Sequence, residues 1–102
     1  MGLFAGLFGG SNRLSRDDIQ AKVAAGAWLV DVRTPGEFAS GHAKGARNVP
    51  LQDLPARAKE LPMDRELIVY CRSGARSASA ASMLRSKGFE KVHDAGGLGN
   101  VM

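Results

Sequence analysis

The only cysteine in the chain, Cys71, is followed by residues that could stabilise negative charge on its sulfur. In the stretch YCRSGARSAS, Arg72 and Arg76 flank three small residues. These are Ser73, Gly74 and Ala75. Small residues let backbone N–H groups turn inward and form an anion-binding concavity. Nearby guanidinium groups and a helix N-terminus lower the pKa of a thiol. The stretch therefore predicts a reactive thiolate, with a buried inert cysteine as the alternative.

The segments on either side of this loop indicate where it lies. LIVY, residues 67–70, is the strongest strand signal in the chain, and an Ala- and Ser-rich helix is predicted over residues 76–87, closed by Gly88. A turn from a strand into a helix lies at the carboxyl edge of a parallel sheet, where open α/β sheets bind ligands. We therefore expect Cys71 at the ligand-binding edge.

The rest of the chain alternates helices with short apolar strands. Ser15 followed by Asp18 predicts a helix that Gly26 ends, and Thr34 followed by Glu37 predicts a second helix. Further strands are expected over residues 28–32, briefly within 46–50, and over 89–95, with a helix over 51–61. This alternation predicts an α/β fold with a central parallel sheet and helices on both faces.

The composition is that of one small globular domain. The 102 residues are 44% hydrophobic and 24% charged, which leaves little room for a second domain. The net charge of +4 comes from Lys and Arg scattered among acidic residues with few aromatic residues, so nucleic-acid binding has little support. A site for a small anion fits this charge balance better.

The first ten residues, MGLFAGLFGG, are apolar and rich in glycine. They lack the positive region and cleavage site of a secretory signal, and the run is too short to span a bilayer. We predict that residues 1–12 are a flexible tail, that residues 13–102 are the folded domain, and that the protein is cytoplasmic. Contact of the tail with a membrane or a partner is a less favoured alternative.

Three motifs resemble, in order and spacing, the single-domain rhodaneses, a family of sulfurtransferases: LVDVRTPGEFASGHAKGARNVP, IVYCRSGARSASAA and AGGL. The resemblance implies a small rhodanese-like α/β domain whose cysteine takes a sulfane sulfur from a donor, becomes a persulfide and passes the sulfur on. It implies no cofactor. The donor would be thiosulfate or a protein persulfide, and the acceptor cyanide, a small thiol or a thioredoxin-like protein.

The resemblance also assigns roles to residues. Cys71 would carry the sulfur, and the backbone of residues 71–76 would cradle the outer sulfur of the persulfide. Arg72 and Arg76 would attract an anionic donor. Asp31 and Arg33, after the first strong strand, could line the pocket, although a structural role at the strand end is slightly favoured.

Two other functions stay open at this point. A Cys-dependent phosphatase or arsenate reductase needs five residues between cysteine and arginine to surround its oxyanion, but only four separate Cys71 from Arg76, and Ser77 follows. A non-catalytic interaction or regulatory module is disfavoured by the presence of the cysteine and both loop arginines.

The histidines give weaker signals. His42 is expected to make a local hydrogen bond, Glu37 to cap its helix, and His93 to point into solvent. Neither histidine lies at metal-ligand spacing from the other or from Cys71, so we expect no metal site.

The sequence departs from the family pattern in three places. Ala43 stands where a larger apolar residue is common, Ala95 stands where an acid is frequent, and the sequence stops at Met102 before an aromatic-containing last helix. We therefore expect a more open pocket, which would favour a protein acceptor.

Overall fold

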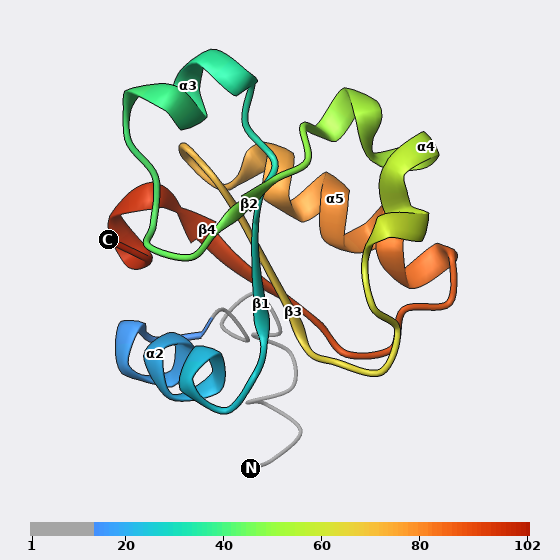
Figure 1. Ribbon diagram of the computed structural model, residues 1–102, viewed down its shortest axis with the longest axis horizontal. Coiled ribbons are helices and arrows are strands. Elements are labelled where there is room, and N and C mark those ends of the chain that lie inside the picture. The colour runs from blue at the N-terminus through green and yellow to red at the C-terminus, as the bar shows by residue number, and fades with distance from the viewer. Residues whose placement is uncertain (1–13) are drawn as a thin grey trace, which may run out of the picture.

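Four parallel strands form the centre of the computed structural model, which describes residues 14–102 (Figure 1). The strands are β1 (Trp28–Asp31), β2 (Arg47–Asn48), β3 (Leu67–Cys71) and β4 (Val92–Gly97), in the order β2-β1-β3-β4. Every neighbouring pair is parallel, so the carboxyl ends meet at one edge of the sheet. The predicted tail, residues 1–12, lies outside the described residues.

Helices and short 3₁₀ turns connect the strands. The helices are α2 (Arg16–Ala24), α3 (Pro35–Ser40), α4 (Leu54–Arg57) and α5 (Ala75–Ser86), and the 3₁₀ turns are η2 (Leu51–Asp53), η3 (Ala58–Glu60) and η4 (Leu98–Asn100). Helix α2 and turn η4 pack on one face of the sheet, whereas α4 and α5 pack on the other (Figure 1). The predicted α/β fold with helices on both faces is confirmed.

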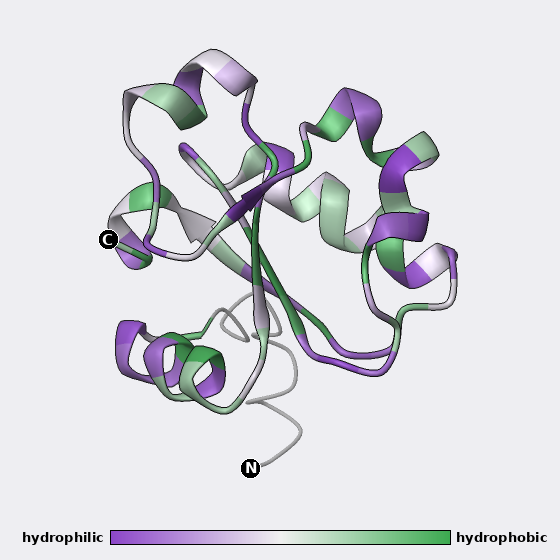
Figure 2. Cartoon of the chain, viewed as in Figure 1, coloured by the Kyte–Doolittle hydropathy of each residue, from purple (hydrophilic) through white to green (hydrophobic). Residues whose placement is uncertain are grey.

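Alternating strand residues supply one hydrophobic core on each face of the sheet. Val30 and Val69 belong to the core that includes residues of α4 and α5. Their neighbours Leu29 and Ile68 belong to the core that includes Ile19 of α2. Successive strand side chains point to opposite faces, so β1 and β3 are hydrophobic over most of their length (Figure 2). A sheet packed on both sides gives the loop after β3 a rigid base.

Both predicted capping boxes are present. Ser15 Oγ accepts from the Asp18 N–H at 3.1 Å, and the Ser15 N–H donates to the Asp18 carboxylate at 3.4 Å. Thr34 Oγ1 accepts from the Glu37 N–H at 3.2 Å, and Glu37 Oε1 accepts from the Thr34 N–H at 3.0 Å. These bonds satisfy N–H groups that a helix start leaves unpaired, so they fix where α2 and α3 begin.

The helices in the described residues are short. The predicted helix over residues 51–61 is divided into η2, α4 and η3. Pro55 has no N–H to donate to the Leu51 carbonyl, which explains why η2 does not continue into α4 as one regular helix. Within residues 14–102, no helix is long and apolar enough to cross a membrane.

The predicted end of the last strand is wrong. Strand β4 begins at Val92, later than expected, and runs through Gly96 and Gly97, which the sequence places after the strand. The two glycines pair with Tyr70 and Cys71 of β3. This pairing overrides the low strand propensity of glycine.

Candidate active site

Cys71 is the last residue of β3 and lies at the carboxyl edge of the sheet. The loop after it turns at Gly74, whose φ of 110° lies in the left-handed region that glycine adopts without strain. Gly74 is also the N-cap of α5. The Cys71 side chain is buried, so a reactant has to enter the loop to reach the sulfur.

Two groups of the loop and helix contact the sulfur directly. The Gly74 N–H donates to Cys71 Sγ at 2.9 Å, and the thiol donates to Ser77 Oγ at 3.6 Å. The Ser77 hydroxyl donates to the carbonyls of Gly74 at 3.0 Å and Gly96 at 3.4 Å. Ser77 therefore links the loop to β4. In the sequence, Ser77 stood out only as the residue at the place where a phosphatase has arginine, and its contact with sulfur was missed.

The surroundings of Cys71 favour its thiolate. Burial raises the pKa of the thiol, because a charge is costly in a medium of low polarity. Once the thiol has lost its proton, the Ser77 hydroxyl can turn and donate to the sulfur. This hydrogen bond and those from the backbone of Ser77, Gly74 and Ser73 outweigh burial and hold the pKa of Cys71 below its usual range. The sequence analysis attributed this effect to backbone N–H groups and the helix start together with the loop arginines. The backbone contribution agrees with that prediction, whereas the arginines are not among the main causes.

Ser77→Ala should raise the pKa of Cys71 and slow its reaction with iodoacetamide several-fold at neutral pH. The variant removes the hydroxyl that stabilises the thiolate and keeps the backbone donors. Only the thiolate is alkylated, so the midpoint of alkylation rate against pH should move to higher pH. Ser79→Ala, at an exposed position of α5, is the matched control. An unchanged midpoint in Ser77→Ala would mean that the backbone alone sets the pKa.

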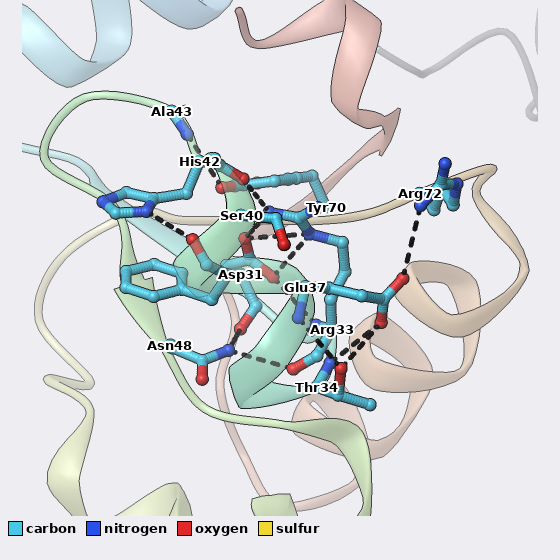
Figure 3. A network of polar contacts seen from close by, with 12 residues as sticks. Asp31, Arg33, Thr34, Glu37, Ser40, His42, Ala43, Asn48, Tyr70 and Arg72 are labelled. Atoms are coloured by element: carbon cyan, nitrogen blue, oxygen red, sulfur yellow. Dashed lines mark hydrogen bonds and ion pairs between the residues drawn. The ribbon is translucent and has the colours of Figure 1, made fainter.

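The two arginines of the loop meet a carboxylate from α3. Arg76 forms a bidentate ion pair with Glu37, 2.7 Å to Oε1 and 3.0 Å to Oε2. Arg72, whose side chain is 74% exposed, lies 4.0 Å from the same carboxylate (Figure 3). The Arg76 guanidinium, with the Thr34 N–H and hydroxyl, lowers the pKa of Glu37 to about 2. Glu37 is therefore ionised at neutral pH.

Glu37 does more than the sequence predicted for it. The expected helix cap is present, but the ion pair with Arg76 joins residues 39 positions apart, and no local pattern indicates it. The pair changes the expected role of Arg76, because part of its positive charge is cancelled before a donor arrives. Arg72 is the more exposed and more weakly paired arginine.

Asp31 and Arg33 form a buried ion pair. Arg33 contacts Asp31 Oδ2 through Nη2 at 2.7 Å and through Nε at 3.0 Å (Figure 3). Arg33 Nη2 also donates to the Gly41 carbonyl at 2.7 Å, and its guanidinium lies 5.8 Å from the centroid of the Tyr70 ring. These contacts connect the end of β1 with the loop after α3. They agree with the structural role, and a role of Arg33 in the pocket stays a prediction.

Neither histidine is placed to assist Cys71. His42 Nδ1 makes the expected local hydrogen bond, 2.8 Å from the Phe38 carbonyl. The expectation of a solvated His93 is met only in part, since its side chain is 27% exposed and Nε2 lies 2.6 Å from Glu66 Oε1, a hydrogen-bond partner from another segment. Glu66 precedes β3, at the opposite edge of the sheet from Cys71. Residues 14–102 contain no group of three or more side chains that could hold a metal ion.

Gly97 of β4 lies against the backbone of the cysteine loop. A Cβ at this position would lie 2.7 Å from the Arg72 carbonyl oxygen, which is too close. The Leu98 N–H donates to the same oxygen at 3.3 Å, and Ser73 forms an isolated bridge with Gly97. The GG of the AGGL motif therefore lets β4 support the loop from one side.

A small pocket adjoins the loop. Its volume is about 180 Å³, and it is lined by Arg76 and by residues from the end of β1 and around η2: Val32, Thr34, Pro50, Leu51 and Gln52. The walls are mainly apolar, and the pocket offers room for a small ligand beside Arg76.

These features define a class of protein, a small parallel α/β domain whose buried cysteine ends a central strand and receives hydrogen bonds from the following loop and helix. The family model described as Rhodanese-like domain matches residues 15–98. The chain belongs to this family.

Relatives of known name agree with the family. A protein from Allochromatium vinosum named sulfurtransferase is 45% identical over 64 residues, covering 63% of this chain and 60% of that protein. Thiosulfate sulfurtransferase GlpE of Stutzerimonas stutzeri is 38% identical over 85 residues, covering 83% of this chain and 78% of GlpE. A solved rhodanese with anions from E. coli has a TM-score of 0.69 and 32% identity, covering 74% of this chain and 91% of that one. This chain spans less than two thirds of the Allochromatium protein.

Proposed function

We propose that this protein is a sulfurtransferase that carries sulfane sulfur as a persulfide on Cys71. The contact of the Cys71 sulfur with the Gly74 N–H and with Ser77 is the observation on which the proposal rests. Donors fixed in position stabilise negative charge on a thiolate and on the outer sulfur of a persulfide. The names of the two sequence relatives support the same reaction class.

In the first half-reaction, the Cys71 thiolate attacks the sulfane sulfur of thiosulfate. A sulfur–sulfur bond forms at Cys71, the sulfur–sulfur bond of the donor breaks, and sulfite leaves with the bonding electron pair. In the second half-reaction, cyanide or a thiolate attacks the outer sulfur, and the Cys71 thiolate leaves. Atoms and charges balance without an external oxidant, and the covalent intermediate divides the transfer into two displacement steps.

The loop residues have separate parts in this cycle. Arg72, exposed at the mouth, attracts the anionic donor. The backbone at Ser73, Gly74 and Ala75 surrounds the transferred sulfur, and Arg76 borders the adjoining pocket. Arg33 contributes through its bond with Asp31, which holds the neighbouring loop in place.

The donor in the cell is thiosulfate or a protein persulfide, and the acceptor is a small thiol or a thioredoxin-like protein. The protein acts in the cytoplasm, where thiols are kept reduced. Reduced surroundings keep the single cysteine available for the next cycle.

Steady-state kinetics with thiosulfate and cyanide test this proposal. Initial rates of thiocyanate formation, measured at several cyanide concentrations, should give parallel double-reciprocal lines, because a persulfide intermediate requires ping-pong kinetics. Converging lines would contradict a free persulfide enzyme. The same preparation should not hydrolyse p-nitrophenyl phosphate above background, and hydrolysis that depends on Cys71 would favour the phosphatase instead.

A further inference from the structure

The charge at the mouth of the cysteine loop is smaller than the sequence suggests. Arg72 and Arg76 bring two positive charges, but the Glu37 carboxylate lies 2.7 Å from one guanidinium and 4.0 Å from the other. The nearby Asp31 and Arg33 cancel each other in their own pair. One net positive charge therefore faces an incoming donor.

Building on the proposed sulfur transfer, we propose that Glu37 is a specificity-determining residue that limits how strongly the site prefers donors of higher negative charge. Its carboxylate occupies the Arg76 guanidinium that a dianion would otherwise bind, and it lies within reach of Arg72. Within residues 14–102, the hydrogen bonds and ion pairs of the Glu37 side chain go to Thr34, Arg76 and Arg72, and none goes to Cys71, Gly74 or Ser77. Glu37 acts on the donor through the arginines and through its own charge.

Two anionic donors can report this effect. Thiosulfate carries two negative charges and methanethiosulfonate carries one, and both present a sulfane sulfur bonded to a sulfonyl-type sulfur. In each case the Cys71 thiolate attacks the sulfane sulfur, the sulfur–sulfur bond of the donor breaks, and sulfite or methanesulfinate leaves with the electron pair. The chemistry at sulfur is thus alike, and the charge of the donor differs.

Removing the Glu37 charge should help the dianion about twice as much, on a logarithmic scale, as the monoanion, because Coulomb energy is proportional to ligand charge. For charges within a Debye length, one unit is worth roughly a threefold to tenfold change in affinity at low salt. The ratio of kcat/KM for thiosulfate to kcat/KM for methanethiosulfonate should therefore rise roughly threefold to tenfold in Glu37→Gln, and the rise should shrink as NaCl is added.

Glutamine removes the negative charge of residue 37 without removing the hydrogen bond that stabilises the start of α3. Gln at this position can still accept the Thr34 N–H and complete the capping box, so α3 should keep its start. Glu37→Asp retains the charge and should leave the ratio within about twofold of wild type. Glu60→Gln removes an equivalent charge from the Arg57 pair, next to α4, and controls for the net charge of the protein.

Glu37→Gln also removes the ion pair that positions the Arg76 side chain, and a double variant separates this effect from the effect of charge. Glu37→Gln combined with Arg76→Gln leaves Arg72 as the one net positive charge at the loop, as in the wild type. Its donor ratio should return toward the wild-type value even if its overall rate is low, since losses common to both donors cancel in the ratio.

The outcomes are distinct. A raised ratio in Glu37→Gln, with unchanged ratios in Glu60→Gln and Glu37→Asp, supports the assignment. An unchanged ratio in Glu37→Gln, an equal rise in Glu60→Gln, or a double variant that keeps the raised ratio overturns it. Absence of Cys71-dependent transfer from both donors in the wild type would instead contradict the proposed function.

Discussion

Replacing Cys71 by serine should lower thiocyanate formation from thiosulfate and cyanide to background, a loss of roughly 10³-fold or more. Serine fits the same buried position, but its hydroxyl is not ionised at neutral pH and cannot form a persulfide. The chain has no second cysteine that could take over. The loss should therefore be complete rather than partial.

The same variant should remain folded. Serine is close in size to cysteine and can accept the Gly74 N–H that now meets the sulfur. Its thermal midpoint and circular dichroism should therefore stay near those of the wild type. A folded Cys71→Ser variant that keeps more than a few per cent of the transfer rate would show that sulfur passes through the protein without this thiol.

Replacing Asp31 by alanine should destabilise the protein by about 3–5 kcal/mol, the range observed when one partner of a buried ion pair is removed. The Arg33 guanidinium would remain in a position where its side chain is only 3% exposed, without the carboxylate that it contacts at 2.7 Å. Domains of this size have only about 5–15 kcal/mol of total stability. The midpoint of urea unfolding should fall markedly.

Two further variants separate the buried pair from ordinary surface charge. Glu60→Ala breaks the exposed Arg57–Glu60 pair and should barely move the unfolding midpoint. Asp31→Leu combined with Arg33→Met removes both charges and should recover part of the lost stability, since no unpaired charge is left buried. If Asp31→Ala lost no more stability than Glu60→Ala, the pair would not hold the end of β1.

The starts of two helices and the two most apolar strands could be predicted, because each depends on residues that are close together in the sequence. The capping boxes at Ser15 and Thr34 each involve residues three positions apart, and both helices begin where these residues indicate. The apolar runs at residues 28–32 and 67–70 predicted two buried strands, and the structure places both at the centre of the sheet. The position of Cys71 at the sheet edge followed from a strand that leads directly into a helix.

Contacts between distant segments escaped the sequence analysis. Glu37 and Arg76 lie on different elements, and their meeting depends on how α3 packs beside the loop. Gly96 and Gly97 have low strand propensity and join β4 only because they fit against β3 and the Arg72 carbonyl. Arg33 is buried because it pairs with Asp31, and it lies beyond the end of β1, where strand alternation does not indicate the direction of a side chain.

The intact mass of the purified protein, before and after incubation with thiosulfate, tests the central claim most directly. We predict that the wild type gains the mass of one sulfur atom, that cyanide removes it, and that Cys71→Ser gains nothing. Addition of sulfur to Cys71→Ser, or wild-type turnover without a cyanide-labile sulfur on the protein, would contradict a persulfide carried on Cys71.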